Sequence, residues 1–413
     1  MSDTSHKNKP SLFRKIFRTT IIFLFLIVVA ANLFILISGK TYLYKGLKET
    51  YLKGKSGPGI YDSVVFPSRK ADKANNPLPW SFAKEQKELT LDEIDFLSQI
   101  KTTSFLVVQD GKIIHESYYS NHKENTKSNT FSAAKSFVGL LIGIAIDEGH
   151  IKSFDDPITD YLDFSVPNDS LVTIQHLLTM SSGLNWVESD ANPLSDNAEA
   201  YYGSDLPQIM SDVSFDGEPG KEYVYKSGNS QLLGIILENA TGMTATKYLE
   251  KQVWSKINTE NDLLWSLDQE DGMEKAFCCI YGTSRDFAKI GQLILNEGSW
   301  NGNQIISKKT LAALLQPINK KERFYGMHFW RYEDPEHPIV YARGILGQYI
   351  IVIPSLNTVV VRTGHERLDK YEIPESKSNN SSFIDKNQHK VKHPLDLFQY
   401  ISTAKRMVKK SSR

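Results

Sequence analysis

The feature that most limits how this chain can fold is a run of 21 residues without a charge, residues 19–39. At 1.5 Å of rise per residue, a helix of that length is roughly 30 Å long, the thickness of a bilayer's hydrocarbon core. Nothing in the run marks a polar face, which disfavours a buried helix of a soluble core. The sequence therefore predicts a membrane anchor over residues 19–39, preceded by a short basic tail of residues 1–18.

A cleaved signal peptide is the alternative to an anchor. Val29-Ala30-Ala31 is a passable cleavage site, but the chain stays apolar for several residues after it, so we favour the uncleaved anchor. Five basic residues and one acidic residue stand on each flank, in residues 1–18 and 40–55, so the positive-inside rule gives no orientation.

Composition excludes several classes of protein. The 413 residues carry 48 basic and 48 acidic side chains, so no broad basic surface for nucleic acid is expected. Cys278 and Cys279 are neighbours and the chain has no other cysteine. Adjacent cysteines bridge only with strain, so we expect no disulfide framework and no four-cysteine zinc site, and the pair is expected to pack in the core. No metal ion or cofactor is expected.

The rest of the chain predicts a connector followed by one α+β domain. Residues 40–90 contain glycines and prolines that break helices, and we assign them to a juxtamembrane connector. Within residues 91–410, Asp110-Gly111 separates two β-rich runs and indicates a hairpin. Extended runs return late in the chain, at residues 338–342, 349–353 and 358–363.

Helical patterns fill the middle of this domain and close it. They lie at residues 132–148, 174–180, 232–241, 244–254, 284–296, 308–315 and 394–408. Residues 366–392 are polar and are expected to form a surface loop. Strands at both ends of a helical middle predict an α/β sandwich: one antiparallel sheet from the N- and C-terminal parts of the domain, flanked by helices, with a mainly helical insertion.

A search for a catalytic nucleophile leaves one pattern, Ser-x-x-Lys. Gly-x-Ser-x-Gly, His-Glu-x-x-His and the P-loop pattern are absent from the sequence. Ser-x-x-Lys occurs five times, but only Ser132-Ala133-Ala134-Lys135 follows a β-rich segment and opens a long apolar helix. At a helix start, free N–H groups favour negative charge at Ser132, and Lys135 lies on the same face. The alternative is an N-cap serine with a solvated lysine.

A second element supports the first. Residues 222–234, EYVYKSGNSQLLG, read as an extended piece, a Ser-Gly turn and a helix, and Thr241-Gly242 follows. Together with Ser132-x-x-Lys135, this segment resembles the serine β-lactamase and penicillin-binding-protein superfamily, and is most similar to its β-lactamase-related esterases and amide hydrolases of the 6-aminohexanoate-dimer-hydrolase type. The resemblance covers about residues 95–408 and includes residues 173–184, 283–291 and 300–302.

The resemblance implies a set of site residues. Tyr225 matches the family's general acid/base tyrosine and Ser227 its second polar residue, which positions the lysine and tyrosine. Arg343-Gly344, before the strand that starts at Gln348, falls where the family has Lys-Thr-Gly or His-x-Gly and binds substrate. The oxyanion-hole donors are then the backbone N–H groups of Ser132 and Ile345. Tyr225 as a core aromatic, Ser227 as a turn former and Arg343 as a surface cation remain open.

Serine needs a base to become a good nucleophile. No histidine is suitably placed, so the base is Lys135 as the amine or Tyr225 as the phenolate. Burial disfavours an ammonium while a nearby ammonium favours a phenolate, so which group holds the proton stays open.

Departures from the family pattern limit the substrate. Ser227 stands where β-lactamases commonly have asparagine, Arg343 replaces a lysine, and no glutamate of the class A type can be assigned. Antibiotic hydrolysis is therefore disfavoured, and an ester, a short amide or a D-amino-acid peptide fits better. Residues 185–202 are the candidate substrate-contacting flap.

The sequence thus predicts a single-pass, membrane-anchored serine hydrolase that forms an acyl-enzyme on Ser132. The resemblance implies a catalytic domain outside the cytoplasmic membrane and a small-molecule or short-peptide substrate. A non-catalytic penicillin-recognising binding or sensor protein is the alternative, and a structural envelope protein ranks last.

Overall fold

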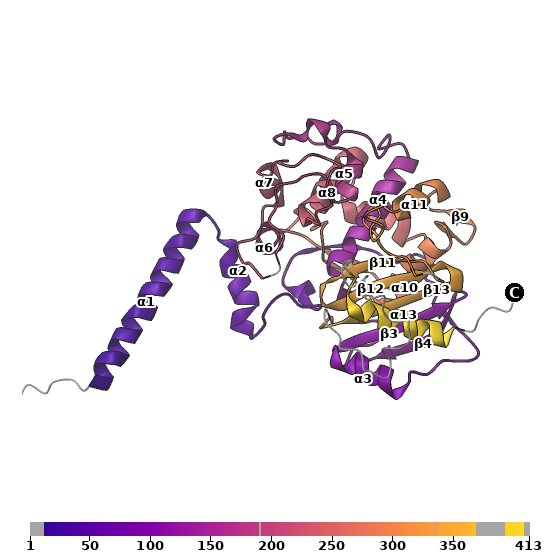
Figure 1. Ribbon diagram of the computed structural model, residues 1–413, viewed down its shortest axis with the longest axis horizontal. Helices are drawn as coiled ribbons and strands as arrows, with labels where there is room; N and C mark the ends of the chain where they lie inside the picture. The colour runs from indigo at the N-terminus through magenta and orange to yellow at the C-terminus, as the bar shows by residue number, and fades with distance from the viewer. Residues whose placement is uncertain (1–11, 190, 335, 369–392, 409–413) are drawn as a thin grey trace, which may run out of the picture. The chain divides into compact units, whose positions relative to one another are not determined.

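The chain folds as two compact units, Met1–Ser56 and Gly57–Arg413, and we call the second the main unit. The computed structural model describes residues 12–189, 191–334, 336–368 and 393–408 (Figure 1). Most of the polar segment 366–392 therefore lies outside the described residues.

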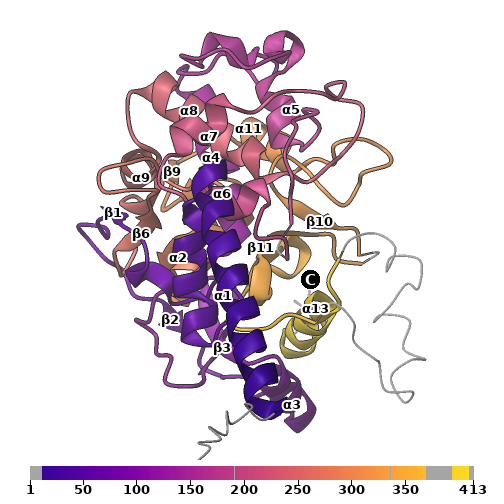
Figure 2. The ribbon, with the colours of Figure 1, turned by 90° about the vertical axis from the view of Figure 1, so that its left-hand side faces the viewer.

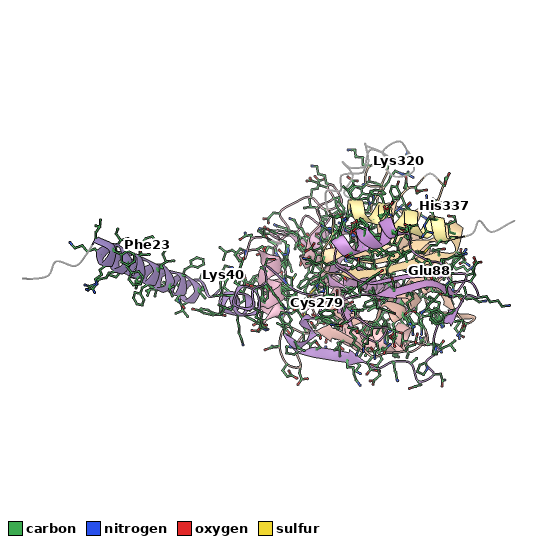
Figure 3. All side chains as sticks on the ribbon, turned by 90° about the horizontal axis from the view of Figure 1, so that it is seen from below. Phe23, Lys40, Glu88, Cys279, Lys320 and His337 are labelled. Atoms are coloured by element: carbon green, nitrogen blue, oxygen red, sulfur yellow. A yellow bond between two sulfur atoms is a disulfide. The ribbon has the colours of Figure 1, made fainter. Side chains whose placement is uncertain are left out.

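The first unit contains the apolar run. Residues Leu12–Ser38 form one helix, α1, of 27 residues, and none of them is buried. Phe23, for example, projects outward and is 62% exposed (Figure 3). A helix this long and apolar can cross a bilayer, and a signal sequence has the same properties. After it comes α2 (Tyr42–Glu49), where the Tyr44 hydroxyl donates to Asn32 Oδ1 of α1 at 2.8 Å.

A seven-stranded sheet lies at the centre of the main unit (Figure 1). In spatial order its strands are β10 (Trp330–Tyr332), β11 (Ile339–Gly344), β12 (Gln348–Ile353), β13 (Thr358–Gly364), β3 (Thr102–Gln109), β4 (Lys112–Tyr118) and β2 (Ser81–Phe82). All neighbours are antiparallel except β2 and β4. The predicted hairpin and the predicted union of early and late strands are both confirmed.

Side chains alternate between the two faces of this sheet because the strand period is two residues. Val359 and Val361 of β13 point into a core shared with α10 (Ser284–Leu295). Val360 points into a second core shared with α3 (Leu91–Gln99) and α13 (Leu395–Met407). Helices on both faces make the predicted α/β sandwich.

The helical insertion packs on the side of α10 and fills the upper half of Figure 2, whereas α3 and α13 lie in its lower half. Its helices are α4 (Ala134–Asp147), α5 (Ile174–Leu178), α6 (Asp196–Tyr202), α7 (Leu206–Ser211), α8 (Ser227–Thr241), α9 (Ala245–Leu249) and α11 (Lys308–Leu315). Helix α4 contacts both α8 and α11. A Cβ on Gly143 would lie 2.9 Å from Ile306 and Leu314, so glycine permits the close approach of α11.

The sequence predicted one sheet, and the described residues contain three. A four-stranded sheet has the order β1 (Ser68–Ala71), β6 (Leu263–Ser266), β7 (Ile280–Gly282) and β5 (Ser128–Asn129). A short hairpin joins β8 (Ser299–Trp300) to β9 (Asn303–Gln304).

The four-stranded sheet also changes the domain boundary. The strands β1 and β2 come from the stretch that we assigned to a connector, so the main unit begins at Gly57, ahead of residue 91. The pairing partner of β1 lies almost 200 residues later in the chain, and local sequence pattern carries no record of such a contact.

Candidate active site

A sharp turn between β5 and α4 presents Ser132. Phe131 has a φ of +46°, a conformation that few non-glycine residues adopt. Asn129 at the end of β5 holds the turn, because its Oδ1 accepts a hydrogen bond from the Phe131 N–H at 2.9 Å. Ser132 follows in a 3-10 turn that leads into α4, and its side chain is partly exposed. Backbone strain of this kind clusters at functional sites.

Lys135 lies one helical turn after Ser132 and is 2% exposed. Its Nζ donates to Ser132 Oγ at 3.1 Å and to the carbonyl oxygen of Phe277 at 2.7 Å. The Nζ also lies 5.1 Å from the centroid of the Tyr225 ring, within the range of a cation–π contact. The structure thus brings the three expected side chains together, although among the described contacts Lys135 meets Tyr225 through its ring and not by a hydrogen bond to its hydroxyl.

Ser132 opens into a cavity of about 110 Å³. Ile345, whose N–H is one expected oxyanion donor, lines the same cavity. The expected flap also contributes, through Glu188, Asn197 and Tyr202. Residues 185–202 therefore lie where a substrate bound at Ser132 would touch them.

The turn that carries Ile345 is held by two buried side chains. Gln348 Nε2 donates to the carbonyl oxygens of Ile345, at 3.2 Å, and Gly364, at 2.7 Å. Arg362 Nη1 donates to the carbonyl oxygens of Leu346, at 2.9 Å, and Gly347, at 2.7 Å. Gln348 was expected to contact substrate, but it is 2% exposed and bonded to the backbone. The structure gives it the role of a brace for the turn.

Gly344 and Arg343 also act differently from a pair of substrate-binding side chains. A Cβ on Gly344 would lie 2.0 Å from the carbonyl oxygen of Thr130, so only glycine lets the end of β11 touch the turn that precedes Ser132. The Arg343 guanidinium stacks on the Trp330 ring at 3.6 Å, and that ring lies 5.8 Å from the Tyr225 ring. Arg343 thus supports the aromatic wall beside Tyr225.

Ser227 has a partner that the sequence did not suggest. Its N–H and its hydroxyl donate to the two carboxylate oxygens of Glu188, each at 2.7 Å. Trp186 Nε1 also donates to this carboxylate, at 2.9 Å. The carboxylate caps the N-terminus of α8, where negative charge is favourable. Ser227 was expected to position Lys135 and Tyr225, whereas its hydroxyl orients Glu188 at the edge of the cavity.

Cys278 and Cys279 are joined by a disulfide, contrary to the expectation that they would pack as thiols. Both are buried, and Cys278 lines the cavity of Ser132. Cys279, marked in Figure 3, has a φ of +73°. The pair directly follows Phe277, whose carbonyl oxygen accepts the hydrogen bond from Lys135. The wall behind the expected base is therefore cross-linked.

A buried histidine lies behind this cluster. Burial lowers the pKa of His328 to about 3, with smaller contributions from a hydrogen bond and the charge of Lys135. Its ring bonds to Ser230 at 2.8 Å and to the Leu178 carbonyl oxygen at 2.8 Å. The neutral ring therefore acts as a structural link between α8 and α5. Among the described residues, no cluster of histidine, cysteine or carboxylate side chains could hold a metal ion.

Comparison with known proteins identifies the family of this site. The beta-lactamase family profile matches residues 91–366, two thirds of the chain. The chain belongs to the beta-lactamase family. It is 25% identical over 292 residues to the 6-aminohexanoate-dimer hydrolase of Paenarthrobacter ureafaciens, covering 64% of this chain and 73% of that protein.

Solved structures of the beta-lactamase fold are also similar. A family VIII carboxylesterase has a TM-score of 0.58 at 17% identity, covering 77% of this chain and 96% of its own. A penicillin-binding protein from Bacillus halodurans has a TM-score of 0.52 at 19% identity, covering 66% and 95%. These structures support the fold. With the family match and the amide-hydrolase relative, this chain is a hydrolase of the beta-lactamase family.

Proposed function

We propose that this chain is a membrane-anchored serine hydrolase that cleaves an ester or amide bond through an acyl-enzyme on Ser132. The observation that carries the proposal is the 3.1 Å hydrogen bond from Lys135 Nζ to Ser132 Oγ, at the mouth of a cavity that Ile345 also lines. A nucleophile, a base within hydrogen-bond reach and a nearby backbone donor are the elements that acyl transfer needs.

In the proposed first step, Lys135 as the neutral amine takes the hydroxyl proton while Ser132 Oγ bonds to the substrate carbonyl carbon. The carbonyl oxygen gains the negative charge, and the N–H groups of Ser132 and Ile345 donate to it. Each such donor is typically worth about 3 kcal/mol of barrier. Arg362 and Gln348 keep the Ile345 turn in place during this step.

Collapse of the tetrahedral intermediate breaks the bond to the alcohol or amine, which leaves with a proton from Tyr225 or from the Lys135 ammonium. Water then attacks the acyl-enzyme, and its proton returns to the same pair of groups. This second attack releases the acid and restores the Ser132 hydroxyl, so all atoms and protons balance over the cycle.

The cavity favours a small substrate. Tyr202, Phe277 and Cys278 give it apolar walls, and Glu188 supplies one carboxylate. These walls suit a short acyl chain, and the relatives named as an amide hydrolase and a carboxylesterase support an ester, a short amide or a D-amino-acid peptide. Neither relative fixes the substrate of this chain.

The proposed location is the outer side of the cell membrane, with residues 19–39 as the anchor. The exposed apolar helix α1 supports an anchor. The Cys278–Cys279 disulfide supports an oxidising compartment, because cytosolic proteins rarely keep disulfides. Recovery of the intact N-terminus from a membrane fraction tests the anchor, and a chain that begins after residue 31 would identify a signal peptide instead.

The chemistry is tested with Ser132→Ala and a matched control, Ser98→Ala, because Ser98 starts another Ser-x-x-Lys pattern but is exposed on α3. We expect Ser132→Ala to lower kcat/KM for p-nitrophenyl esters about 10,000-fold and to abolish fluorophosphonate labelling, and Ser98→Ala to leave both unchanged. Labelling of Ser132 without turnover would favour the sensor alternative. An unlabelled Ser132 and an active Ser132→Ala variant would refute the proposal.

A further inference from the structure

A second cavity, of about 380 Å³, lies far from Ser132 in the main unit. Its walls come from the β3–β4 turn, the C-terminal half of α10, the β8–β9 hairpin and residues 78–81. Asn357, which immediately precedes β13, borders this cavity, whereas Gly364 ends β13 beside the Ile345 turn. The strand between them is seven residues long, so the two cavities are roughly 20 Å apart along the sheet.

The lining combines flat aromatic rings with neutral amides. Trp80 and Trp300 supply the rings. Side-chain amides come from Gln292, Asn296, Asn301 and Asn357. Each amide both donates and accepts hydrogen bonds, as hydroxyl groups do. The volume lies in the range of about 300–1,000 Å³ that is typical of ligand pockets.

Gln292 supplies the observation that points to a ligand. Its side chain is 6% exposed, and in the described part of the chain its Oε1 has no hydrogen-bond partner. Its Nε2 donates to Asn296 Oδ1 at 2.8 Å, which fixes the orientation of the amide. A buried acceptor without a donor costs about 1–3 kcal/mol, so a donor from a ligand would recover a cost that the empty fold carries.

The other groups are held in fixed positions. Trp80 Nε1 donates to the Arg285 carbonyl oxygen at 2.9 Å, and Trp300 Nε1 donates to Asn258 Oδ1 at 2.8 Å. Asn357 Nδ2 donates to Asp110 Oδ1 at 2.6 Å. Rings and amides that are already fixed lose little entropy when a ligand binds.

Charge selects the class of ligand. Lys289 lines the cavity, but its Nζ donates to the carbonyl oxygens of Leu78 and Asn258 and lies 3.4 Å from Glu260. Its charge is therefore already compensated, and Asp110 adds a carboxylate. A phosphate or carboxylate ligand would gain little here, whereas a neutral ligand with several hydroxyl groups and C–H faces matches both the amides and the indole rings.

We propose that this cavity is a carbohydrate-binding site, separate from Ser132, in which the amide oxygen of Gln292 accepts a hydrogen bond from a sugar hydroxyl. The site is independent of the proposed hydrolase activity, and the catalytic serine takes no part in it.

The test measures the binding of cellobiose, maltose and N,N′-diacetylchitobiose to the full chain in detergent, by saturation-transfer NMR and titration calorimetry. We expect at least one of these sugars to bind wild type and Ser132→Ala equally, and to bind Gln292→Met at least tenfold more weakly. Ester hydrolysis by Gln292→Met should equal that of wild type. If none of the three sugars binds at tens of millimolar, or if Gln292→Met binds as wild type does, the proposal is wrong.

Thermal unfolding separates a binding role from a structural one. Methionine has a similar length and removes the buried oxygen, so the Tm of Gln292→Met without sugar should equal or exceed that of wild type. Sugar should raise the Tm of wild type and leave that of Gln292→Met unchanged. A clear fall in the Tm of Gln292→Met without sugar would show that the amide serves the fold, and would count against the proposal.

Discussion

The two sides of the Ser132 cavity are built in different ways. On the helical side, Ser132 and Lys135 of α4 offer side chains three residues apart. On the sheet side, the turn between β11 and β12 offers the backbone of Ile345, and the shape of that turn depends on Arg362 from the next strand. The two sides touch where Gly344 meets Thr130. The comparison teaches that chemistry carried by side chains is written locally, while chemistry carried by the backbone depends on distant residues.

Removal of the base should have the largest effect on this arrangement. We expect Lys135→Met to lower kcat for ester hydrolysis 1,000- to 10,000-fold, because Ser132 then loses the group that takes its proton. Steady-state and pre-steady-state kinetics with a chromogenic ester measure the loss. Lys101→Met is the control, since Lys101 ends the exposed Ser-x-x-Lys pattern and should be neutral. A Lys135→Met variant that keeps a tenth of wild-type activity would move the base to another residue.

The contact between the two sides gives the second largest expected effect. A methyl group in Gly344→Ala would overlap the Thr130 carbonyl oxygen, so the turn before Ser132 must shift. We expect kcat to fall about 100-fold, since a displacement of about 1 Å at a reacting group has a cost of that size. Gly57→Ala, which meets open space, is the matched control. Equal activity of the two variants would show that the close contact does not set the geometry of the site.

The brace on the sheet side should matter less for activity than for stability. Arg362→Lys keeps the charge but loses the planar fork that reaches two carbonyl oxygens of the turn and that of Ile100. We expect the free energy of unfolding to fall by about 2 kcal/mol and kcat to fall about tenfold. Urea unfolding and kinetics on the same preparation give both values. Fluorophosphonate labelling of Ser132 should persist, which separates the sheet side from the helical side.

The smallest expected effect is the pH dependence of stability. Burial lowers the pKa of His328 and of His393 to about 3, so each stabilises the fold fully above its ordinary pKa near 6.5 and loses that contribution as the pH falls toward 3. Each adds about 1.4 kcal/mol of destabilisation per pH unit in this window.

Asp396 acts in the opposite direction. Burial raises its pKa to about 6, so its contribution is full below its ordinary pKa of 3.8 and is lost as the pH rises through 6. Between pH 6 and pH 4 it therefore opposes the histidines. In Asp396→Asn, stability should fall about 1.4 kcal/mol per pH unit more steeply than in wild type over that range. Chemical denaturation at pH 6, 5 and 4 measures the slopes, and parallel slopes would show that Asp396 is ionised throughout.

Local patterns predicted much of the fold and the helical side of the site. The period of 3.6 residues gave α4 and α11, and Asp110-Gly111 gave the hairpin of β3 and β4. The spacing of Ser132 and Lys135 predicted their contact because helix geometry alone brings such residues together.

Long-range partners explain what the sequence could not predict. Glu188 bonds to Ser227, 39 residues later, and nothing in the spacing of an acidic loop marks that contact. Gln348 and Arg362 turn inward to the backbone, whereas their polar character suggested contact with substrate or solvent. The only general signal for such residues is burial, which appears once the strands are in register.

The bond between Cys278 and Cys279 has a practical consequence. The chain contains no other cysteine, so the fold leaves no free thiol anywhere along its length. A cysteine introduced at the rim of the Ser132 cavity, for example by Asn197→Cys, would be the sole target for a maleimide dye or a spin label, with no native position to remove first. Arrival of an acyl group beside such a reporter could then be followed in real time, by light or by magnetic resonance.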